Sequence, residues 1–236
     1  GKKHIIQTIE TAKPDIITIC ATHLKSRELF MVAQNLVYAA AIPHEQIKVL
    51  FAPSDAALIY ARSRASEMER LDLSQQQQVS ETVLIAASTA RRVQNPLSEL
   101  TRLCTQEKNY LVKLPLHRFQ SQFLNEQTET GIIYEACELA CIKAVAISGV
   151  DVSKLHSMHH RGALQFLPGF GPKFAEFILK KFTSTSADKR SIRSRLDLKF
   201  DMDECPRISD NAISFLRFPG QIKKVKIDDR DDQSKG

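Results

Sequence analysis

Along the first sixty residues, short apolar runs typical of strands alternate with stretches whose apolar residues have helical spacing. Ile16–Cys20 is nearly all apolar and largely β-branched, and it follows the turn residues Lys13-Pro14-Asp15. Such a run is typical of a strand buried on both faces of a sheet. Gln46–Phe51 predicts a second short strand, and apolar residues at helical spacing predict helices before, between and after the two strands. This alternation predicts an α/β domain.

Helix boundaries in this domain carry their own signals. We expect Ser26 to cap the helix between the strands, Pro43 to close it, and Ser54 or Asp55 to cap the next helix. Two strands do not form a stable sheet by themselves. We therefore expect this domain to be incomplete, with its first strands absent from the chain.

The pattern then becomes helical. Glu69–Gln78 contains four consecutive glutamines and is typical of a polar linker, and helices are predicted over Val79–Val93 and Leu97–Leu103, with Pro96 in the first turn of the second. A further helix is predicted over Gly131–Ser148, with Gly149 just past its end. The expected fold class is therefore α/β followed by an all-α domain. The charged tail beyond Phe218 is expected to be poorly ordered.

Composition excludes several classes of protein. The chain has 236 residues with 43% hydrophobic and 25% charged residues, contains no apolar run long enough to span a membrane, and starts without the apolar stretch of a signal peptide. Its five cysteines form no C-x-x-C pair. Cys137 and Cys141 share a helical face, which favours free thiols over a zinc site and indicates a reducing intracellular compartment.

Positive charge is concentrated in one segment. Ten basic and three acidic residues lie between Val152 and Phe200, a net charge of +7 within a chain whose total is +6. The other 187 residues therefore carry −1 together. A local basic patch of this kind is the electrostatic signature of a protein that contacts a phosphate backbone, although a solvated Lys/Arg surface has the same composition.

A glycine-rich hairpin lies inside this basic segment. An apolar helix is predicted to end at Leu167-Pro168, and a second helix starts after Gly169-Phe170-Gly171. The glycines permit a tight turn with positive φ, and Phe170 is expected to be buried between the two helices. Backbone amides at the start of the second helix favour a phosphate. The predicted nucleic-acid-binding residues are Gly169, Phe170, Gly171, Lys173, Lys180 and Lys181. A plain corner between two helices needs the same glycines.

Other groups of polar residues indicate chemistry more weakly. His156, His159 and His160 lie close together, but no acid or cysteine at ligand spacing accompanies them, so we predict no metal site and no cofactor. A two-metal nuclease needs carboxylates gathered at the strand ends. No acid follows Cys20 directly, and Asp55 is explained by helix capping, so we predict no catalytic residues.

Several motifs resemble a known family. Lys13-Pro14-Asp15-Ile16-Ile17 with Ser26-Arg27 resembles part of a YqgF domain, which has an RNase H-like fold. The segment 90–99 (ARRVQNPLSE) is the most specific match to the Tex-like suppressor-of-Ty family of transcription elongation factors, and similarity continues through residues 57–65, 116–120, 148–152 and 194–216. His117-x-x-Gln120 favours the eukaryotic histone-chaperone branch. The resemblance covers roughly residues 13–218.

The resemblance implies a domain order and a set of partners. It implies a partial YqgF/RNase H-like domain over 1–113, a helix-hairpin-helix domain over 114–218 and a charged tail over 219–236. It further implies a nuclear, non-catalytic scaffold that contacts DNA or RNA without reading sequence and works with RNA polymerase II and histones, with no membrane partner. Two alternatives stay open: a RuvC-like metal-dependent nuclease with its other acids upstream, and a basic segment that binds acidic proteins.

Overall fold

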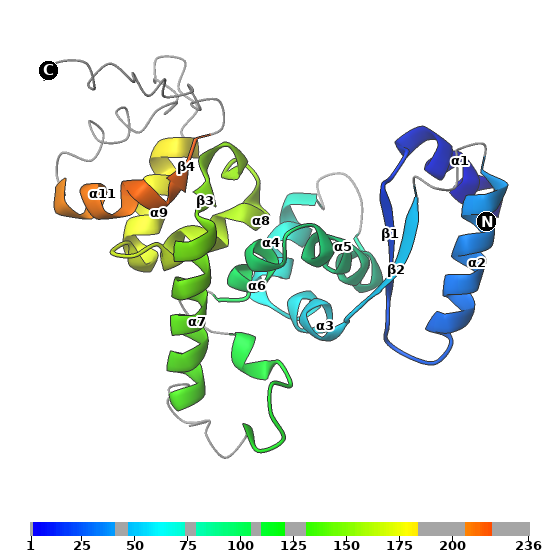
Figure 1. Ribbon diagram of the computed structural model, residues 1–236, viewed down its shortest axis with the longest axis horizontal. Helices are drawn as coiled ribbons and strands as arrows, with labels where there is room; N and C mark the ends of the chain where they lie inside the picture. Colours follow the sequence, from blue (N-terminus) through cyan, green and yellow to red (C-terminus); the bar gives the residue numbers. More distant parts are fainter. Residues whose placement is uncertain are drawn as a thin grey trace, which may run out of the picture. The chain divides into compact units, whose positions relative to one another are not determined.

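A computed structural model describes residues 2–40, 47–73, 79–104, 110–120, 131–183 and 206–218. The chain divides into two compact units, residues 1–143 and 144–236. The described part is mostly helical with two small parallel sheets, which agrees with a mixed α/β region followed by a helical region (Figure 1). The boundary expected at residue 113 separates the two domains that the family resemblance implies, not two compact units, and it stays a prediction.

The first part of unit 1 is built on a two-stranded parallel sheet. Strand β1 (Ile16–Cys20) pairs in register with β2 (Lys48–Ala52), so that Ile16 lies opposite Lys48 and Cys20 opposite Ala52. The helix α2 (Ser26–Ala39) connects the strands, and α1 (Lys2–Ala12) precedes them. The predicted strand at Ile16–Cys20 is confirmed, and the second lies within two residues of its predicted position.

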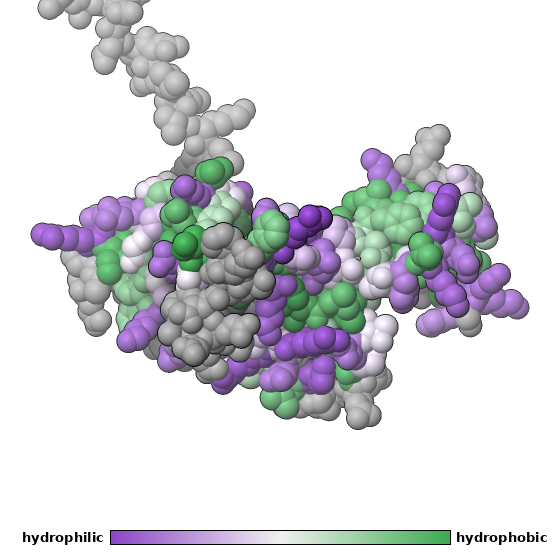
Figure 2. All heavy atoms as spheres, turned by 90° about the horizontal axis from the view of Figure 1, so that it is seen from below, coloured by the Kyte–Doolittle hydropathy of each residue, from purple (hydrophilic) through white to green (hydrophobic). Residues whose placement is uncertain are grey.

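One small core holds α1 and α2 against the sheet. It contains Ile9, Leu36, Val37, Ala40 and Ile47, with Ile17 and Val49 of the two strands packed against it. Alternate strand residues point to the opposite face, where the Thr89 hydroxyl lies 3.5 Å from the Cys20 sulfur. Large apolar side chains nevertheless stay exposed here, including Leu29, Met31, Tyr38 and Phe51, and Figure 2 shows apolar surface on this part of unit 1.

Four helices follow the sheet: α3 (Asp55–Ala61), α4 (Arg64–Leu73), α5 (Glu81–Gln94) and α6 (Pro96–Arg102). Helix α5 packs on α3, on α6 and on the sheet. Ser80 caps α5 by accepting from the amide of Val83, and Asn95 caps α6 by accepting from the amide of Ser98. The predicted helices 79–93 and 97–103 and the place of Pro96 in a first turn are confirmed.

The short 3₁₀ helix η2 (Tyr110–Lys113) and the long helix α7 (Ile132–Ser148) follow, and α7 leads from unit 1 into unit 2. Gly149 ends α7 with a φ of +68°, as predicted, and donates its amide to Val145. Strand β3 (Val150–Asp151) pairs in parallel with β4 (Leu216–Arg217). A Cβ on Gly149 would approach the Phe215 carbonyl oxygen to 2.9 Å, so this position also needs glycine for packing.

The rest of unit 2 is helical. It consists of η4 (Val152–Lys154), α8 (Met158–Arg161), η5 (Gly162–Phe166), α9 (Gly171–Thr183), α11 (Pro206–Ala212) and η6 (Ile213–Phe215). Its core is formed by apolar side chains of η4, η5, α9, the two strands and the residues that connect these elements: Val150, Val152, Leu155, Leu164, Phe166, Leu167, Phe170, Ile178 and Leu216. Among the described helices of the chain, none combines the length and apolar character that crossing a bilayer requires.

Four sequence-based expectations need correction. The Ser26 hydroxyl does not cap α2: it donates to the Cys20 carbonyl at 3.1 Å, because Ser26 lies inside the first turn, directly behind β1. Ser54 occupies the N-cap position of α3, yet its hydroxyl donates to the Ala21 carbonyl at 3.2 Å. Glu69 belongs to α4 and not to a linker. The first hairpin helix is interrupted, since Ser157 adopts extended backbone between η4 and α8.

Other expectations concern residues outside the described ranges. These are the closing role of Pro43, the four glutamines 75–78, residues 194–198 of the second hairpin and the tail from 219 onwards. The incomplete sheet and its upstream strands also stay predictions.

Candidate nucleic-acid interface

The turn that leads into α9 is built on two glycines in the left-handed region of backbone conformation. Gly169 has a φ of +89° and Gly171 a φ of +67°, and between them the Phe170 amide donates to the Leu167 carbonyl at 2.9 Å. Residues with a Cβ adopt such φ values only at a cost. The predicted glycine-dependent turn is therefore confirmed.

Phe170 fills the space beneath this turn. Its side chain is 6% exposed and meets the Phe174 ring edge-on, with the ring centroids 4.8 Å apart and an interplanar angle of 76°. Leu164 from η5 and Ile178 from α9 are fully buried in the same core, and η5 packs directly on α9. The predicted burial of Phe170 is confirmed, and the residue holds the turn in place from below.

The solvent side of the turn presents backbone and one cation. Helix α9 has no acidic residue in its first turn, and the amides of a helix's first turn have no partner within the helix. Among the described residues, no atom lies within 4 Å of a Cβ placed on Gly171, so this part of the chain leaves space open above the backbone. Lys173 is exposed in this first turn. The arrangement suits an anion, which the helix dipole also favours.

The two other predicted lysines lie farther along α9. Lys180 follows Lys173 by seven residues, which places it on the same side of the helix, roughly 10 Å along the axis. Its ammonium group lies 3.0 Å from a carboxylate oxygen of Glu176, with both side chains largely exposed. The Lys181 backbone is part of α9, whereas its side chain lies outside the described residues. The structure thus brings together Gly169, Phe170, Gly171 and Lys173.

Part of the basic charge counted in the sequence is structural. The Arg161 guanidinium donates to the backbone carbonyls of Leu155 at 3.0 Å and His156 at 2.9 Å, which ties the last residue of α8 to the turn that precedes the helix. Lys154 pairs weakly with Asp151 at 4.0 Å. Five further basic residues, Lys189, Arg190, Arg193, Arg195 and Lys199, lie outside the described ranges.

The histidines near α8 contact one another and a serine. His159 Nε2 lies 2.6 Å from the Ser157 hydroxyl, and the His159 and His160 rings are 5.3 Å apart. Burial, together with the nearby charge of Lys154, lowers the pKa of His160 below its ordinary value. Within the described ranges, no three His, Cys, Asp or Glu side chains are grouped so as to hold a metal ion.

The carboxyl ends of β1 and β2 lie at the other candidate position for chemistry. Thr22 and His23 follow β1 and are exposed, and their side chains lie 3.3 Å apart. Asp55 is the exposed first residue of α3, close after β2. The described acids that follow the two strands most closely are thus Glu28, in the first turn of α2 after β1, and Asp55, in the first turn of α3 after β2.

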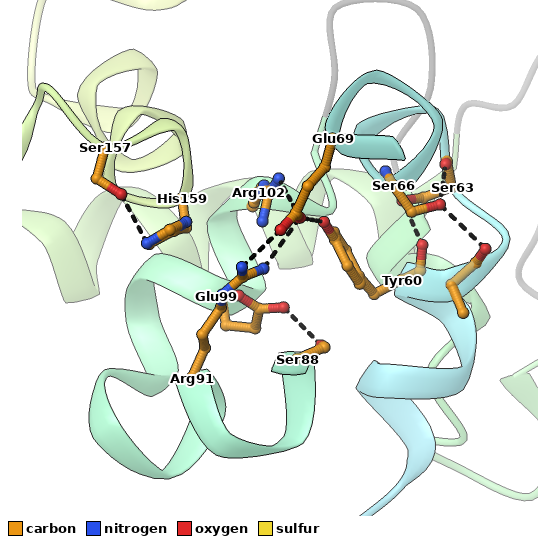
Figure 3. A network of polar contacts seen from close by, with 11 residues as sticks. Tyr60, Ser63, Ser66, Glu69, Ser88, Arg91, Glu99, Arg102, Ser157 and His159 are labelled. Atoms are coloured by element: carbon orange, nitrogen blue, oxygen red, sulfur yellow. Dashed lines mark hydrogen bonds and ion pairs between the residues drawn. The ribbon is translucent and has the colours of Figure 1, made fainter. Parts of the chain in front are cut away.

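A buried polar network in unit 1 was missed by the sequence analysis. Glu69 of α4 accepts two hydrogen bonds from Arg91 of α5, at 2.6 and 3.0 Å, and one from Arg102 of α6 at 3.0 Å (Figure 3). The Tyr60 hydroxyl of α3 also donates to Glu69, and the Arg102 guanidinium lies 4.8 Å from the Tyr60 ring centroid. One carboxylate thereby joins four helices.

The pKa shifts of Glu69 and Tyr60 show that the network stabilises the ionised carboxylate. Burial alone would raise the pKa of Glu69, but the hydrogen bonds from Arg91 and Tyr60 and the charge of Arg102 outweigh it and lower the pKa to about 2. Burial and the hydrogen bond to Glu69 raise the pKa of Tyr60 above its ordinary value. These groups point at one another and away from solvent, so the network is structural.

Glu99 of α6 lies beside this network and differs from Glu69. Its side chain is 1% exposed, and one carboxylate oxygen accepts from the Ser88 hydroxyl at 2.5 Å. The other oxygen has no hydrogen-bond partner among the described residues. Burial raises the pKa of Glu99 despite the hydrogen bond from Ser88 and the charges of Arg102 and Arg91. The two carboxyl groups are thus shifted in opposite directions.

Comparison with known proteins points to one group of relatives, although no family model matches the chain. The chain is 28% identical over 203 residues to the suppressor of Ty 6 homolog of Caenorhabditis elegans, a match that covers 86% of this chain and 12% of the relative. It is 24% identical over 212 residues to the transcription elongation factor SPT6 of Drosophila melanogaster, and 21% identical to that of Schizosaccharomyces pombe.

These similarities support an Spt6-like family for this chain. They extend over 86–89% of its length, beyond any single motif. The chain spans only 11–14% of the length of these three relatives. What the whole relatives do therefore enters only as a basis for a proposal.

Proposed function

We propose that this chain is a non-catalytic piece of a nuclear transcription elongation factor and histone chaperone, and that its α9 hairpin contacts the backbone of DNA or RNA without reading sequence. The observation that carries the contact is the Gly169–Gly171 turn. It exposes the start of α9 beside Lys173, while Phe170 is buried beneath it. Two of the similar proteins carry the name transcription elongation factor, which supports the elongation role.

The contact is electrostatic in this proposal. A phosphate oxygen accepts hydrogen bonds from amides of the first turn of α9, and Lys173 neutralises the charge of the same or the neighbouring phosphate. The turn offers no exposed aromatic ring for base stacking, since Phe170 is buried and Phe174 is half-buried. Binding should therefore be weak and indifferent to sequence.

Further elements of the proposal rest on the Spt6-like similarity. RNA polymerase II and histones are its protein partners, the nucleus is its location, and its sheet region and hairpin correspond to a partial YqgF domain and a helix-hairpin-helix domain. Among the residues that the structure describes, no three His, Cys, Asp or Glu side chains are grouped so as to hold a metal ion, which supports a scaffold over a two-metal nuclease with several acids around its ions.

The test is binding of the 236-residue chain to labelled duplex and single-stranded DNA of unrelated sequences, followed by fluorescence anisotropy in rising KCl. We expect dissociation constants of about 10⁻⁴ to 10⁻⁶ M near physiological salt, similar for all sequences and weakening with salt. A chain that binds no DNA at low salt but binds an acidic polypeptide would instead be a protein-docking module. The same samples incubated with Mg²⁺ or Mn²⁺ should show no cleavage; cleavage that Asp55→Ala abolishes would favour the nuclease.

A further inference from the structure

A short basic and aromatic segment of unit 1, residues 110–120 (YLVKLPLHRFQ), lies outside both the hairpin and the network around Glu69. It follows α6 and precedes α7 in the chain, and it contains two basic residues, three aromatic rings and no acid. These residues are Lys113 and Arg118, and Tyr110, His117 and Phe119. Basic residues interleaved with aromatic rings are typical of surfaces that bind single-stranded nucleic acid.

A buried glutamine fixes the shape of the turn that ends this segment. Gln120 is 9% exposed, and its side-chain amide donates to the Val112 carbonyl in η2. Its side-chain oxygen accepts from the Leu116 amide at 2.9 Å and from the His117 amide at 3.3 Å. The Gln120 backbone amide donates to the His117 carbonyl at 3.2 Å. One buried side chain thus holds the turn from within, and the side chains between His117 and Gln120 are not needed for its shape.

The turn presents two rings and one cation to solvent. Phe119 is 50% exposed, and His117 and Arg118 are exposed beside it. The His117 Nδ1 accepts from the Phe119 amide at 3.2 Å, and the two ring centroids lie 5.8 Å apart with an angle of 49° between the planes. The backbone therefore orients the imidazole, while half of the Phe119 surface stays accessible to a ligand.

We propose that the turn 116–119 is a binding site for single-stranded DNA or RNA, in which a base stacks on Phe119 and Arg118 contacts the adjoining phosphate. Every base has a flat face, so stacking on a fixed aromatic ring needs an unpaired base but no particular sequence. The bases of a duplex are stacked on one another and leave only phosphates for such a turn. This site needs bases, whereas the first turn of α9 needs only phosphates, so the two proposals stand or fall separately.

Charge favours nucleic acid over an apolar protein as the partner. Phe119 together with Leu116, which is 58% exposed, would also suit a hydrophobic surface. Both charged residues of the segment are cations, however, and both are exposed. Lys113 lies over the Tyr110 ring, 5.3 Å from its centroid, and Arg118 lies directly between the two exposed rings in the sequence. A phosphate backbone is the partner that this sign of charge attracts.

Three fluorescent ligands of equal length separate stacking from charge. They are oligothymidine, the same strand with every base removed, and a duplex, and anisotropy gives the dissociation constant of the 236-residue chain for each at one salt concentration. We expect the wild type to bind oligothymidine more tightly than the abasic strand. Phe119→Ala should weaken binding to oligothymidine by about 5- to 150-fold, the loss expected for one stacked base. Its affinity for the abasic strand and for the duplex should match the wild type.

Variants at the same position separate stacking from apolar contact. Phe119→Tyr keeps a ring and should bind oligothymidine as the wild type does, whereas Phe119→Leu keeps apolar volume without a ring and should bind it as Phe119→Ala does. Phe51→Ala is the matched control, because Phe51 of β2 is 48% exposed in the same unit, and it should leave all three affinities unchanged. Thermal melts establish that each variant is folded.

Arg118→Ala tests the phosphate contact. It should weaken binding to oligothymidine and lower the slope of log affinity against log salt by about 0.7, the value for one phosphate of a single strand. The proposal is overturned if Phe119→Ala binds oligothymidine as the wild type does, or if the wild type binds the abasic strand equally well. It is also overturned if Phe119→Leu matches Phe119→Tyr, because an apolar contact would then suffice and a protein would be the better partner.

Discussion

Glu69 and Arg91 form a two-point ion pair inside unit 1, with both carboxylate oxygens bonded to the guanidinium at 2.6 and 3.0 Å. The side chains are 12% and 22% exposed. Parallel hydrogen bonds of this kind fix the orientation of both groups. Since the same carboxylate also binds Arg102 and Tyr60, one acid of α4 is bonded to side chains of α3, α5 and α6.

The first prediction concerns the loss of that acid. Glu69→Gln keeps the shape but leaves Arg91 and Arg102 without a counter-charge, so the free energy of unfolding should fall by about 3–5 kcal/mol. Urea titration followed by circular dichroism measures it. Glu81→Gln is the control: its ion pair with Arg62 is long, at 3.8 Å, and exposed, and its loss should cost less than about 1 kcal/mol. Equal losses would contradict the structural role of Glu69.

The low pKa of Glu69 also sets a pH dependence. Its pKa of about 2 lies below the value of about 4.3 expected in the unfolded chain. The stabilisation from this group is therefore complete well above pH 4.3 and is lost as the pH falls through that value towards 2. Glu69→Gln should lack this contribution, so its stability deficit against the wild type should shrink over the same range.

The second prediction uses the opposite shift of Glu99. Burial raises its pKa, so folding favours the protonated form, and the stability linked to this group is lost as the pH rises through the folded-state pKa. Glu99→Gln imitates the neutral form and should be at least as stable as the wild type at pH 7, with its advantage shrinking towards pH 4. A loss above about 1 kcal/mol at pH 7 would mean that the ionised carboxylate is needed.

The third prediction concerns the residue beneath the hairpin turn. Phe170→Ala removes a ring that is 6% exposed, so the free energy of unfolding should fall by about 3–5 kcal/mol. Phe177→Ala is the control within the same helix, because Phe177 is 38% exposed, and it should cost clearly less. Chemical denaturation measures the free energy of unfolding of both variants. Similar losses of this free energy would show that Phe170 does not anchor the turn.

The fourth prediction separates backbone strain from steric overlap at two glycines. Gly149 and Gly171 have nearly equal φ values of +68° and +67°. Of these two glycines, Gly149 is the one at which a Cβ would overlap an atom of the described residues, the Phe215 carbonyl oxygen at 2.9 Å. Gly171→Ala should therefore cost about 1–2 kcal/mol in unfolding free energy, and Gly149→Ala more. A larger loss at Gly171 would contradict the open space above the turn.

The regular elements were predictable because their causes are local. The β-branched run Ile16–Cys20 and the proline at position 96 specify a strand and a helix start through neighbouring residues alone. The glycine turn was found for the same reason, since glycine is the residue that permits the positive φ found at Gly169 and Gly171. Ser26 was misassigned because its hydroxyl finds the carbonyl of Cys20, six residues earlier, and no local rule describes that contact.

The interactions between distant segments were not predictable. Glu69, Arg91 and Arg102 lie on three different helices. Each of them, taken alone, is a charged residue of the kind that is usually exposed to solvent. The glutamines after residue 74 made Glu69 resemble part of a linker. Such pairings are set by the tertiary fold.

The central claim is that α9 contacts phosphate at its first turn, and the salt dependence of DNA binding tests it most directly. The logarithm of the binding constant is measured against the logarithm of KCl concentration for the wild type, Lys173→Ala and Lys3→Ala. Lys3 is an exposed lysine of α1 in unit 1 and serves as the matched loss of charge. Lys180→Ala is measured as well, because it removes a lysine that forms an ion pair with Glu176.

Each lysine that contacts a phosphate contributes about one unit to the slope of that plot. The account predicts that Lys173→Ala weakens binding equally for all sequences and lowers the slope by about one, that Lys180→Ala has a smaller effect, and that Lys3→Ala matches the wild type. If Lys173→Ala leaves both the affinity and the slope unchanged, the hairpin is only a corner between helices, and the account is contradicted.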